Sequence, residues 1–151
     1  MSEGAELLDL ANGGLEMTIP VAHGMGIRFV ELGPGHAAAE APIEGNGNHL
    51  GTMYAGVLFT VAELLGGALA ISTFDTSAFA PVVKGLTISF LRPARSAVRA
   101  TVAMDDETVD RLTAQASEAG KAEFELVAEV HDAEGTLVAT TTGTYQLRRI
   151  G

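Results

Sequence analysis

The chain has 151 residues, a length that favours one domain and allows a hydrophobic core that folds without disulfides or metals. It contains no cysteine, which excludes a disulfide framework, a cysteine-ligated metal site and a cysteine nucleophile. Its 9 Lys and Arg residues against 19 Asp and Glu residues give a net charge of −10. Neither nucleic acid nor an anionic membrane is therefore an expected partner, because both bind through dense positive charge.

The first 25 residues are expected to form a helical and loop extension ahead of the main domain. Leu7, Leu8 and Leu10 predict a short helix, and the Asn-Gly-Gly triplet at 12–14 predicts its end. The segment is acidic and lacks the basic start and long apolar run of a secretory signal. A cytoplasmic protein is therefore expected.

Two strands are predicted next. Residues 26–32 have strand character and end at a Gly-Pro-Gly turn at 33–35, after which residues 36–43 predict a second strand. Residues 44–51 are rich in Gly and Asn and predict a loop.

The longest predicted element is an apolar helix over residues 52–74. Residues 50–71 are long enough to cross a bilayer, but Glu63 lies near their middle and no Lys or Arg flanks either end closely. A membrane span avoids a charge at its centre. The segment therefore predicts the buried central helix of a soluble domain.

The rest of the chain alternates apolar and polar residues with period two, which predicts half-buried strands. One short amphipathic helix interrupts them, with Asp105 or Asp106 as its N-cap and Gly120 at its end. The predicted strands cover residues 86–90, 98–104, 123–130 and 137–147, and the helix covers residues 105–120.

These elements predict an α+β fold in a single domain of residues 1–151. A curved antiparallel sheet is expected to wrap around the central helix, because a helix that is apolar on all sides must be covered on all sides. The extra helix precedes the last two strands. Gly66, Gly67 and Ala68 are expected to let neighbouring backbones approach the central helix closely.

Glu63 is the residue in this pattern that most needs an explanation. Its neighbours Val61, Ala62, Leu64 and Leu65 are all apolar, and an ionised carboxylate taken out of water is costly unless a partner compensates. One interpretation is a base with a raised pKa at the floor of a cleft. The alternative is a structural carboxylate, either on a wet helix edge or paired with a distant Arg.

The loop before the central helix offers polar groups of two kinds. Asn46, Asn48 and His49 carry amide and imidazole groups, and the helix start supplies unpaired N–H groups that stabilise an oxyanion. Ordinary turn chemistry is the alternative role of the asparagines. For His49 the favoured interpretation is a solvated loop residue.

Residues 48–63, Asn-His-Leu-Gly-Thr-Met-Tyr-Ala-Gly-Val-Leu-Phe-Thr-Val-Ala-Glu, resemble the loop-and-helix signature of hotdog-fold acyl-CoA thioesterases of the phenylacetic-acid-degradation type. The resemblance is closer to the YiiD C-terminal-like thioesterase branch. That branch is similar in its Asn-His-x-Gly-Thr-Met start, its Ala-Glu pair and a later Phe-x-x-Pro-Ala element, here at 90–94. The resemblance extends over residues 26–148 and implies the hotdog fold.

The resemblance also implies roles for particular residues. Asn48 would position the thioester or the attacking water, and the N–H of Ala55, with Gly56 beside it, would polarise the thioester carbonyl. Glu63 matches the acidic residue on the family's helix and would act as base or nucleophile. No metal and no cofactor is implied, apart from the coenzyme A of the substrate.

Two positions depart from the family pattern, and cations for coenzyme A are scarce. The family's typical His-Gly-Gly begins with Tyr54 here, and Gly67 stands where some relatives carry Ser or Thr. Tyr54, Gly67 and His49 are expected to line the substrate site.

Arg92 and Arg95 are the expected partners of the coenzyme A phosphates, with Lys84 nearby. The alternative is that these cations are solvated surface charges.

The expected function is hydrolysis of a small, medium-chain or aromatic acyl-CoA. The resemblance implies a homodimer with a shared site, or a homotetramer built as a dimer of dimers. Two alternatives remain: a hotdog dehydratase or hydratase, which would use a His near the loop, and a non-catalytic acyl- or CoA-binding module, because fold does not determine function.

Overall fold

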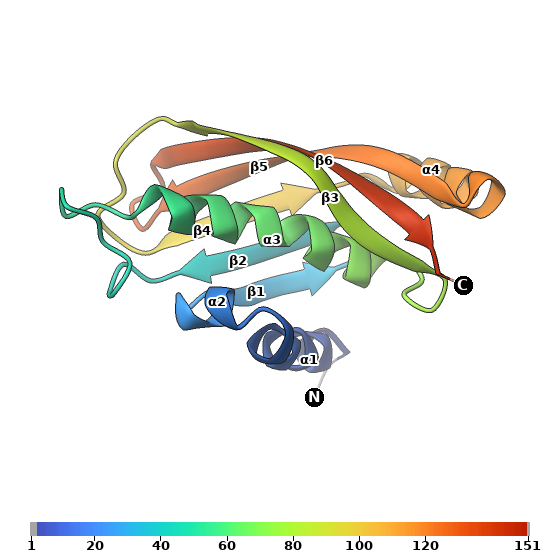
Figure 1. The fold of residues 1–151 in the computed structure, drawn as a ribbon, viewed down its shortest axis with the longest axis horizontal. Coiled ribbons are helices and arrows are strands. Elements are labelled where there is room, and N and C mark those ends of the chain that lie inside the picture. Colours follow the sequence, from blue (N-terminus) through green and yellow to red (C-terminus); the bar gives the residue numbers. More distant parts are fainter. Residues whose placement is uncertain (1–2, 151) are drawn as a thin grey trace.

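A central helix crosses the concave face of a curved sheet in the computed structural model, which describes residues 3–150 (Figure 1). Residues 1, 2 and 151 of the expected domain lie outside the described residues. The elements are α1 (Glu3–Thr18), α2 (Pro20–Gly24), β1 (Arg28–Gly33), β2 (His36–Ala41), α3 (Ala55–Thr73), β3 (Phe79–Phe90), β4 (Val98–Ala103), α4 (Asp106–Ala119), β5 (Lys121–Asp132) and β6 (Leu137–Arg149).

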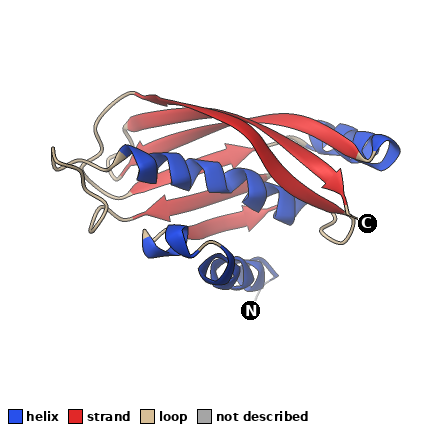
Figure 2. Ribbon diagram, in the orientation of Figure 1, coloured by secondary structure: helices blue, strands red, loops and turns tan. Residues whose placement is uncertain are grey.

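The six strands form one antiparallel sheet in the order β1-β2-β4-β5-β6-β3. This arrangement, with α3 in front of the sheet and α4 before the last two strands, confirms the predicted α+β hotdog architecture (Figure 2). β3 follows α3 in the chain but pairs with β6, so β3 and β1 are the two edge strands.

The predicted start of β3 is wrong. The strand begins at Phe79, well before Leu86, and its first half has no alternating pattern and contains Pro81. Proline cannot donate a ladder hydrogen bond, so it argues against a central strand. Pro81 is opposite Leu147 of β6, and the edge position of β3 leaves its other side free of any pairing requirement.

α3 is the core helix that its composition predicts. Ten of its 19 residues are buried, and it is the one helix within residues 3–150 with the length and hydropathy to cross a membrane. It begins at Ala55 and not at residue 52, because the preceding residues bond to other segments. The Met53 N–H donates to the Ala94 carbonyl at 2.8 Å, and the Tyr54 N–H donates to the Asn46 carbonyl at 2.8 Å.

The close approach to α3 that was expected of neighbouring backbones is made by a side chain instead, and it occurs at Gly66 but not at Gly67. A Cβ on Gly66 would lie 1.9 Å from Cε1 of Tyr145, whose ring stacks on Phe124 of β5 with centroids 5.6 Å apart. A Cβ on Gly67 would meet no heavy atom within 4 Å. Gly66 therefore admits the Tyr145 ring, while Gly67 faces open space.

Gly66→Ala is expected to lower the free energy of unfolding by about 1–3 kcal/mol, because the new methyl group overpacks the Tyr145 ring. Gly67→Ala is the matched control and is expected to raise it by about 0.5–1 kcal/mol, because glycine is entropically unfavourable inside a helix. Urea denaturation of both variants measures the difference. Equal effects of the two substitutions would contradict the packing described here.

The predicted end of the first helix at Asn12 is also wrong. α1 continues through both glycines to Thr18. The Asn12 side chain bonds to the free edge of β1 instead of stopping the helix: its Nδ2 donates to the Phe29 carbonyl at 3.0 Å and its Oδ1 accepts from the Phe29 N–H at 2.7 Å. These contacts and the burial of Leu15 stabilise a helix whose Asn-Gly-Gly segment has low helix propensity.

The predicted caps of α4 are confirmed. The Asp105 carboxylate accepts a hydrogen bond from the Thr108 N–H at 2.8 Å, and Gly120 ends the helix in the left-handed conformation at φ 78°. α4 packs against β5 and β6, away from the helix that carries Glu63.

Candidate active site

Glu63 lies in the middle of α3 and is half-buried. Within residues 3–150, its carboxylate has no ion-pair or hydrogen-bond partner, and the ion pairs found there all involve other acids. Burial raises the pKa of Glu63 above its ordinary value of 4.5. No described Arg of the same chain pairs with Glu63, which contradicts that structural alternative; the other one, a carboxylate on a wet helix edge, stays open.

Tyr145 on β6 is the neighbour of Glu63 that the sequence did not reveal. Its hydroxyl donates to the main-chain carbonyl of Glu63 at 3.3 Å. Burial, followed by the negative charge of Glu63, raises the pKa of Tyr145 to about 12, so the phenol stays protonated at neutral pH. The glycines at 66 and 143 accommodate its ring. They could have indicated this contact from the sequence only if β6 were already known to lie against α3.

Glu63 lines a cavity of about 500 Å³ between α1, β1 and α3. Figure 1 shows α1 beside β1 at the edge of the sheet, seen nearly end-on, whereas α3 lies in the plane of the picture. The α3 wall consists of Glu63, Leu64, Gly67, Ala68 and Ile71. The α1 wall includes Leu7, Leu10, Ala11, Gly14 and Leu15. We call this space the α1–α3 cavity.

The start of α3 offers unpaired N–H groups. Tyr54 is the N-cap residue, with φ −61° and ψ 137°, and its side chain makes no capping bond. The first bonds of the helix are donated by the N–H groups of Val57 and Leu58 to the Tyr54 carbonyl. The N–H groups of Ala55 and Gly56 have no partner among the described residues. This end of a helix stabilises a developing negative charge.

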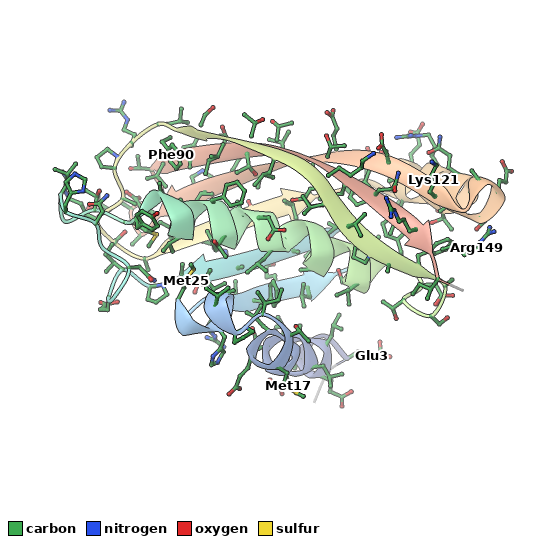
Figure 3. The ribbon with its side chains drawn as sticks, in the orientation of Figure 1. Glu3, Met17, Met25, Phe90, Lys121 and Arg149 are labelled. Atoms are coloured by element: carbon green, nitrogen blue, oxygen red, sulfur yellow. The ribbon has the colours of Figure 1, made fainter. Side chains whose placement is uncertain are left out.

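A second cavity, of about 280 Å³, lies at the start of α3. Asn48, Ala55 and Arg92 line it, as do Phe90 at the end of β3 and Leu91 directly after it. Phe90, labelled in Figure 3, lies near the N-terminal end of α3. Three of the predicted site residues thus come together here, and we call this space the helix-start cavity.

The Asn48 side chain is engaged in its own loop. Its Oδ1 accepts from the N–H groups of Leu50 at 2.9 Å and Thr52 at 3.1 Å, and its Nδ2 donates to Thr52 Oγ1 at 3.0 Å. One amide hydrogen of Asn48 remains without a partner among the described residues. Asn46 has a structural role, because its Nδ2 donates to the Met25 and Pro42 carbonyls at 2.7 Å each.

Glu63 and the helix start do not meet within one chain. Ala55 and Glu63 are eight positions apart on the same helix, which corresponds to about 12 Å along its axis. Each lines its own cavity: Glu63 and Gly67 line the α1–α3 cavity, and Ala55 lines the helix-start cavity. The predicted site residues therefore form two groups and not one.

The remaining predicted residues lie outside both cavities. His49 and Arg95 are exposed, and the Tyr54 side chain, 57 % exposed, has its ring over Gly56. Lys84 is paired with Glu123 at 2.6 Å. Within residues 3–150, no three His, Asp or Glu side chains group as metal ligands would.

The comparisons with known proteins agree with this architecture. A Pseudomonas aeruginosa protein of unknown function, described as a probable thioesterase, is 42 % identical, with 94 % of this chain and 95 % of that chain covered and a TM-score of 0.89. A Shewanella oneidensis protein described as a candidate thioesterase is 26 % identical, with 94 % and 97 % covered and a TM-score of 0.78.

A thioesterase from Haemophilus influenzae shares the fold at 16 % identity, with 94 % and 90 % of the two chains covered and a TM-score of 0.73. No curated protein matches the sequence. The family model for a domain of unknown function, DUF4442, matches residues 9–147. The chain therefore belongs to the DUF4442 family, and its fold is that of the hotdog thioesterase-like proteins.

Proposed function

We propose that the protein hydrolyses the thioester bond of an acyl-CoA, with Glu63 as the reacting carboxylate. The observation that carries this proposal is a half-buried carboxylate with a raised pKa, on the wall of an apolar cavity and with no partner in the described part of the chain. A charged group without a partner is costly to bury, and perturbed carboxylates in cavities are typical of catalytic sites. The similarity to proteins described as thioesterases supports the reaction class.

In the proposed reaction, the N–H of Ala55 donates a hydrogen bond to the thioester carbonyl oxygen and stabilises the oxyanion. Glu63 takes a proton from water, the hydroxide adds to the carbonyl carbon, and the C–S bond breaks as the proton passes to the sulfur. The products are a carboxylic acid and coenzyme A. In the second possible route, the Glu63 carboxylate displaces the thiolate to form an anhydride, which water then cleaves.

We propose a homodimer in which each site uses Glu63 of one chain and Ala55 of the other. The two groups must act on one carbonyl carbon, and reacting atoms approach to about 3–3.5 Å, whereas the helix separates them by about 12 Å within a chain. The exposed edge strand β3 offers an interface, since it carries the exposed side chains of Val82, Val83 and Phe90. A two-fold axis would produce two equivalent shared sites.

Arg92 is the proposed partner of the coenzyme A phosphates, because it is exposed and lines the helix-start cavity beside Ala55. Arg95, three positions later in the same connection, is the second proposed contact. Lys84 is a weaker candidate than either arginine, since Glu123 already neutralises its charge.

Release of free thiol from a panel of acyl-CoA substrates tests the proposal. We expect the wild-type protein to cleave at least one aliphatic or aromatic thioester at a rate that increases with protein concentration. Tight binding without cleavage of any substrate would contradict hydrolysis and favour the binding module. Hydration of an enoyl-CoA would favour the hydratase, for which His49, exposed and outside both cavities, is poorly placed.

A further inference from the structure

The α1–α3 cavity extends well beyond the reacting carboxylate. Glu63 is the first and Ile71 the last α3 residue on its wall, and eight helical positions correspond to about 12 Å. The only other side chain with a polar atom on the wall is Thr18, whose hydroxyl already donates to the Gly14 carbonyl at 2.7 Å. The cavity thus suits a ligand that is apolar along its length and polar at the Glu63 end.

Two glycines on opposite walls leave this space open. Gly14 of α1 and Gly67 of α3 both line the cavity, and a Cβ on either would meet no heavy atom within 4 Å. The Tyr145 ring, in contrast, occupies the space beside Gly66. The sheet therefore occupies one side of α3, while the side at Gly67 remains unfilled.

α1 forms a defined wall of this cavity. The paired hydrogen bonds of Asn12 to Phe29 attach it to β1, Leu15 is buried beneath it, and Met17 is 84 % exposed on its outer side. Met17 is labelled in Figure 3 at the margin of the molecule. The helix therefore presents Leu15 to the cavity and Met17 to solvent, whereas Leu10 lines the cavity but stays largely exposed.

Building on the proposed function, we infer that the α1–α3 cavity binds a straight medium-chain acyl group, such as octanoyl or decanoyl, and that α1 determines the chain length accepted. The thioester carbonyl lies at Glu63, and the chain extends along α3 toward Ile71. A single aromatic ring would leave much of this length empty. Apart from Glu63, the only polar side chain that lines the wall is Thr18, whose hydroxyl hydrogen is already donated to Gly14.

Gly14→Leu tests the inference, because the added side chain occupies the cavity from the α1 side. Each buried methylene contributes about fourfold to binding. We therefore expect the ratio of kcat/KM for decanoyl-CoA to that for butyryl-CoA to fall by at least about tenfold. Gly13→Leu is the matched control: Gly13 is exposed, lies outside this cavity and also has open space around it. Its ratio should equal that of the wild type.

A second variant enlarges the cavity. Leu10 lines it and is 73 % exposed, so Leu10→Ala should fold normally and shift the preference from decanoyl-CoA toward palmitoyl-CoA. Unchanged chain-length preference in both Gly14→Leu and Leu10→Ala would overturn the inference while leaving the proposed hydrolysis intact. So would a wild-type preference for benzoyl-CoA or phenylacetyl-CoA over decanoyl-CoA.

Binding of 1-decanol, an uncharged ligand that is not repelled by the Glu63 carboxylate, is measured by calorimetry and tests the cavity independently of hydrolysis. We expect wild type and Gly13→Leu to bind it with a negative heat-capacity change, the signature of apolar burial, and Gly14→Leu to bind it at least about tenfold more weakly. This result without cleavage of any thioester would support the cavity and contradict the proposed function. Equal binding by all three proteins would contradict the cavity.

Discussion

Glu63→Gln is expected to lower kcat for thioester hydrolysis by about 10²–10⁴-fold, the range that a positioned general base contributes. The amide has nearly the same size as the carboxylate but can neither accept a proton from water nor attack the carbonyl carbon. Glu129→Gln, at an exposed position of β5, is the matched control and should keep wild-type activity. Full turnover by Glu63→Gln would rule out the proposed role of the carboxylate.

The raised pKa of Glu63 adds a pH signature to this prediction. Wild-type kcat/KM should rise with pH as Glu63 loses its proton, with a midpoint above the ordinary value of 4.5. A single-turnover reaction in heavy-oxygen water identifies an anhydride that water cleaves at its Glu63 carbonyl, because only that path transfers an oxygen of Glu63 to the product acid and leaves the label on Glu63. A pH profile of kcat/KM that shows no rise above pH 4.5 would contradict the assignment of Glu63 as the reacting carboxylate.

Stability should change in the opposite direction from activity. The folded protein holds the Glu63 proton more tightly than the unfolded chain, so wild-type stability decreases as pH rises from 4.5 through the raised pKa. The Glu63→Gln variant has no proton to lose at this position. The free energy of unfolding of the variant should therefore increase relative to that of the wild type as pH rises over the same range. Denaturant titrations at several pH values measure this difference. A constant difference would contradict the burial of the charged form.

Ala55→Pro is expected to lower kcat by about 10²–10³-fold, because it removes the N–H proposed to stabilise the oxyanion. Proline is well tolerated at the first position of a helix, and Tyr54 already has the extended conformation, φ −61° and ψ 137°, that a residue before proline adopts. Ala55→Ser keeps the N–H and is the matched control. Unchanged kcat in Ala55→Pro would place the oxyanion elsewhere.

Mixing the Ala55→Pro and Glu63→Gln chains tests whether the site is shared. Each variant alone should be inactive, but a mixed dimer contains one site with both groups intact. Random exchange should therefore restore about a quarter of wild-type activity. Activity that stays at the level of the separate variants after verified exchange would show that each site belongs to a single chain.

Local pattern predicted most of the elements, and its failures have physical reasons. The apolar run of α3, the alternating strands and the caps of α4 are properties of short segments, so they could be read directly. The predicted end of α1 at Asn12 is wrong because the stability of this helix comes from contacts with β1 and not from helix propensity. The start of β3 was missed because Pro81 is acceptable only at a sheet edge.

The candidate site divides in the same way. Glu63 could be identified from its apolar neighbours alone, because the cost of burying a charge does not depend on which elements surround it. The sequence alone could not predict the contact with Tyr145 or the unfilled space at Gly67. Both depend on which strand crosses α3 and where α1 packs.

The sequence by itself determined the class of the fold and the residue that most needed an explanation, since both follow from periodicity and from the energetics of a charge in an apolar segment. Only the tertiary structure decided that Glu63 has no partner among the described residues of its own chain and that the helix start lines a different cavity. It also revealed the role of α1 as a cavity wall. These properties arise from contacts between residues that are distant in the chain, which local patterns do not encode.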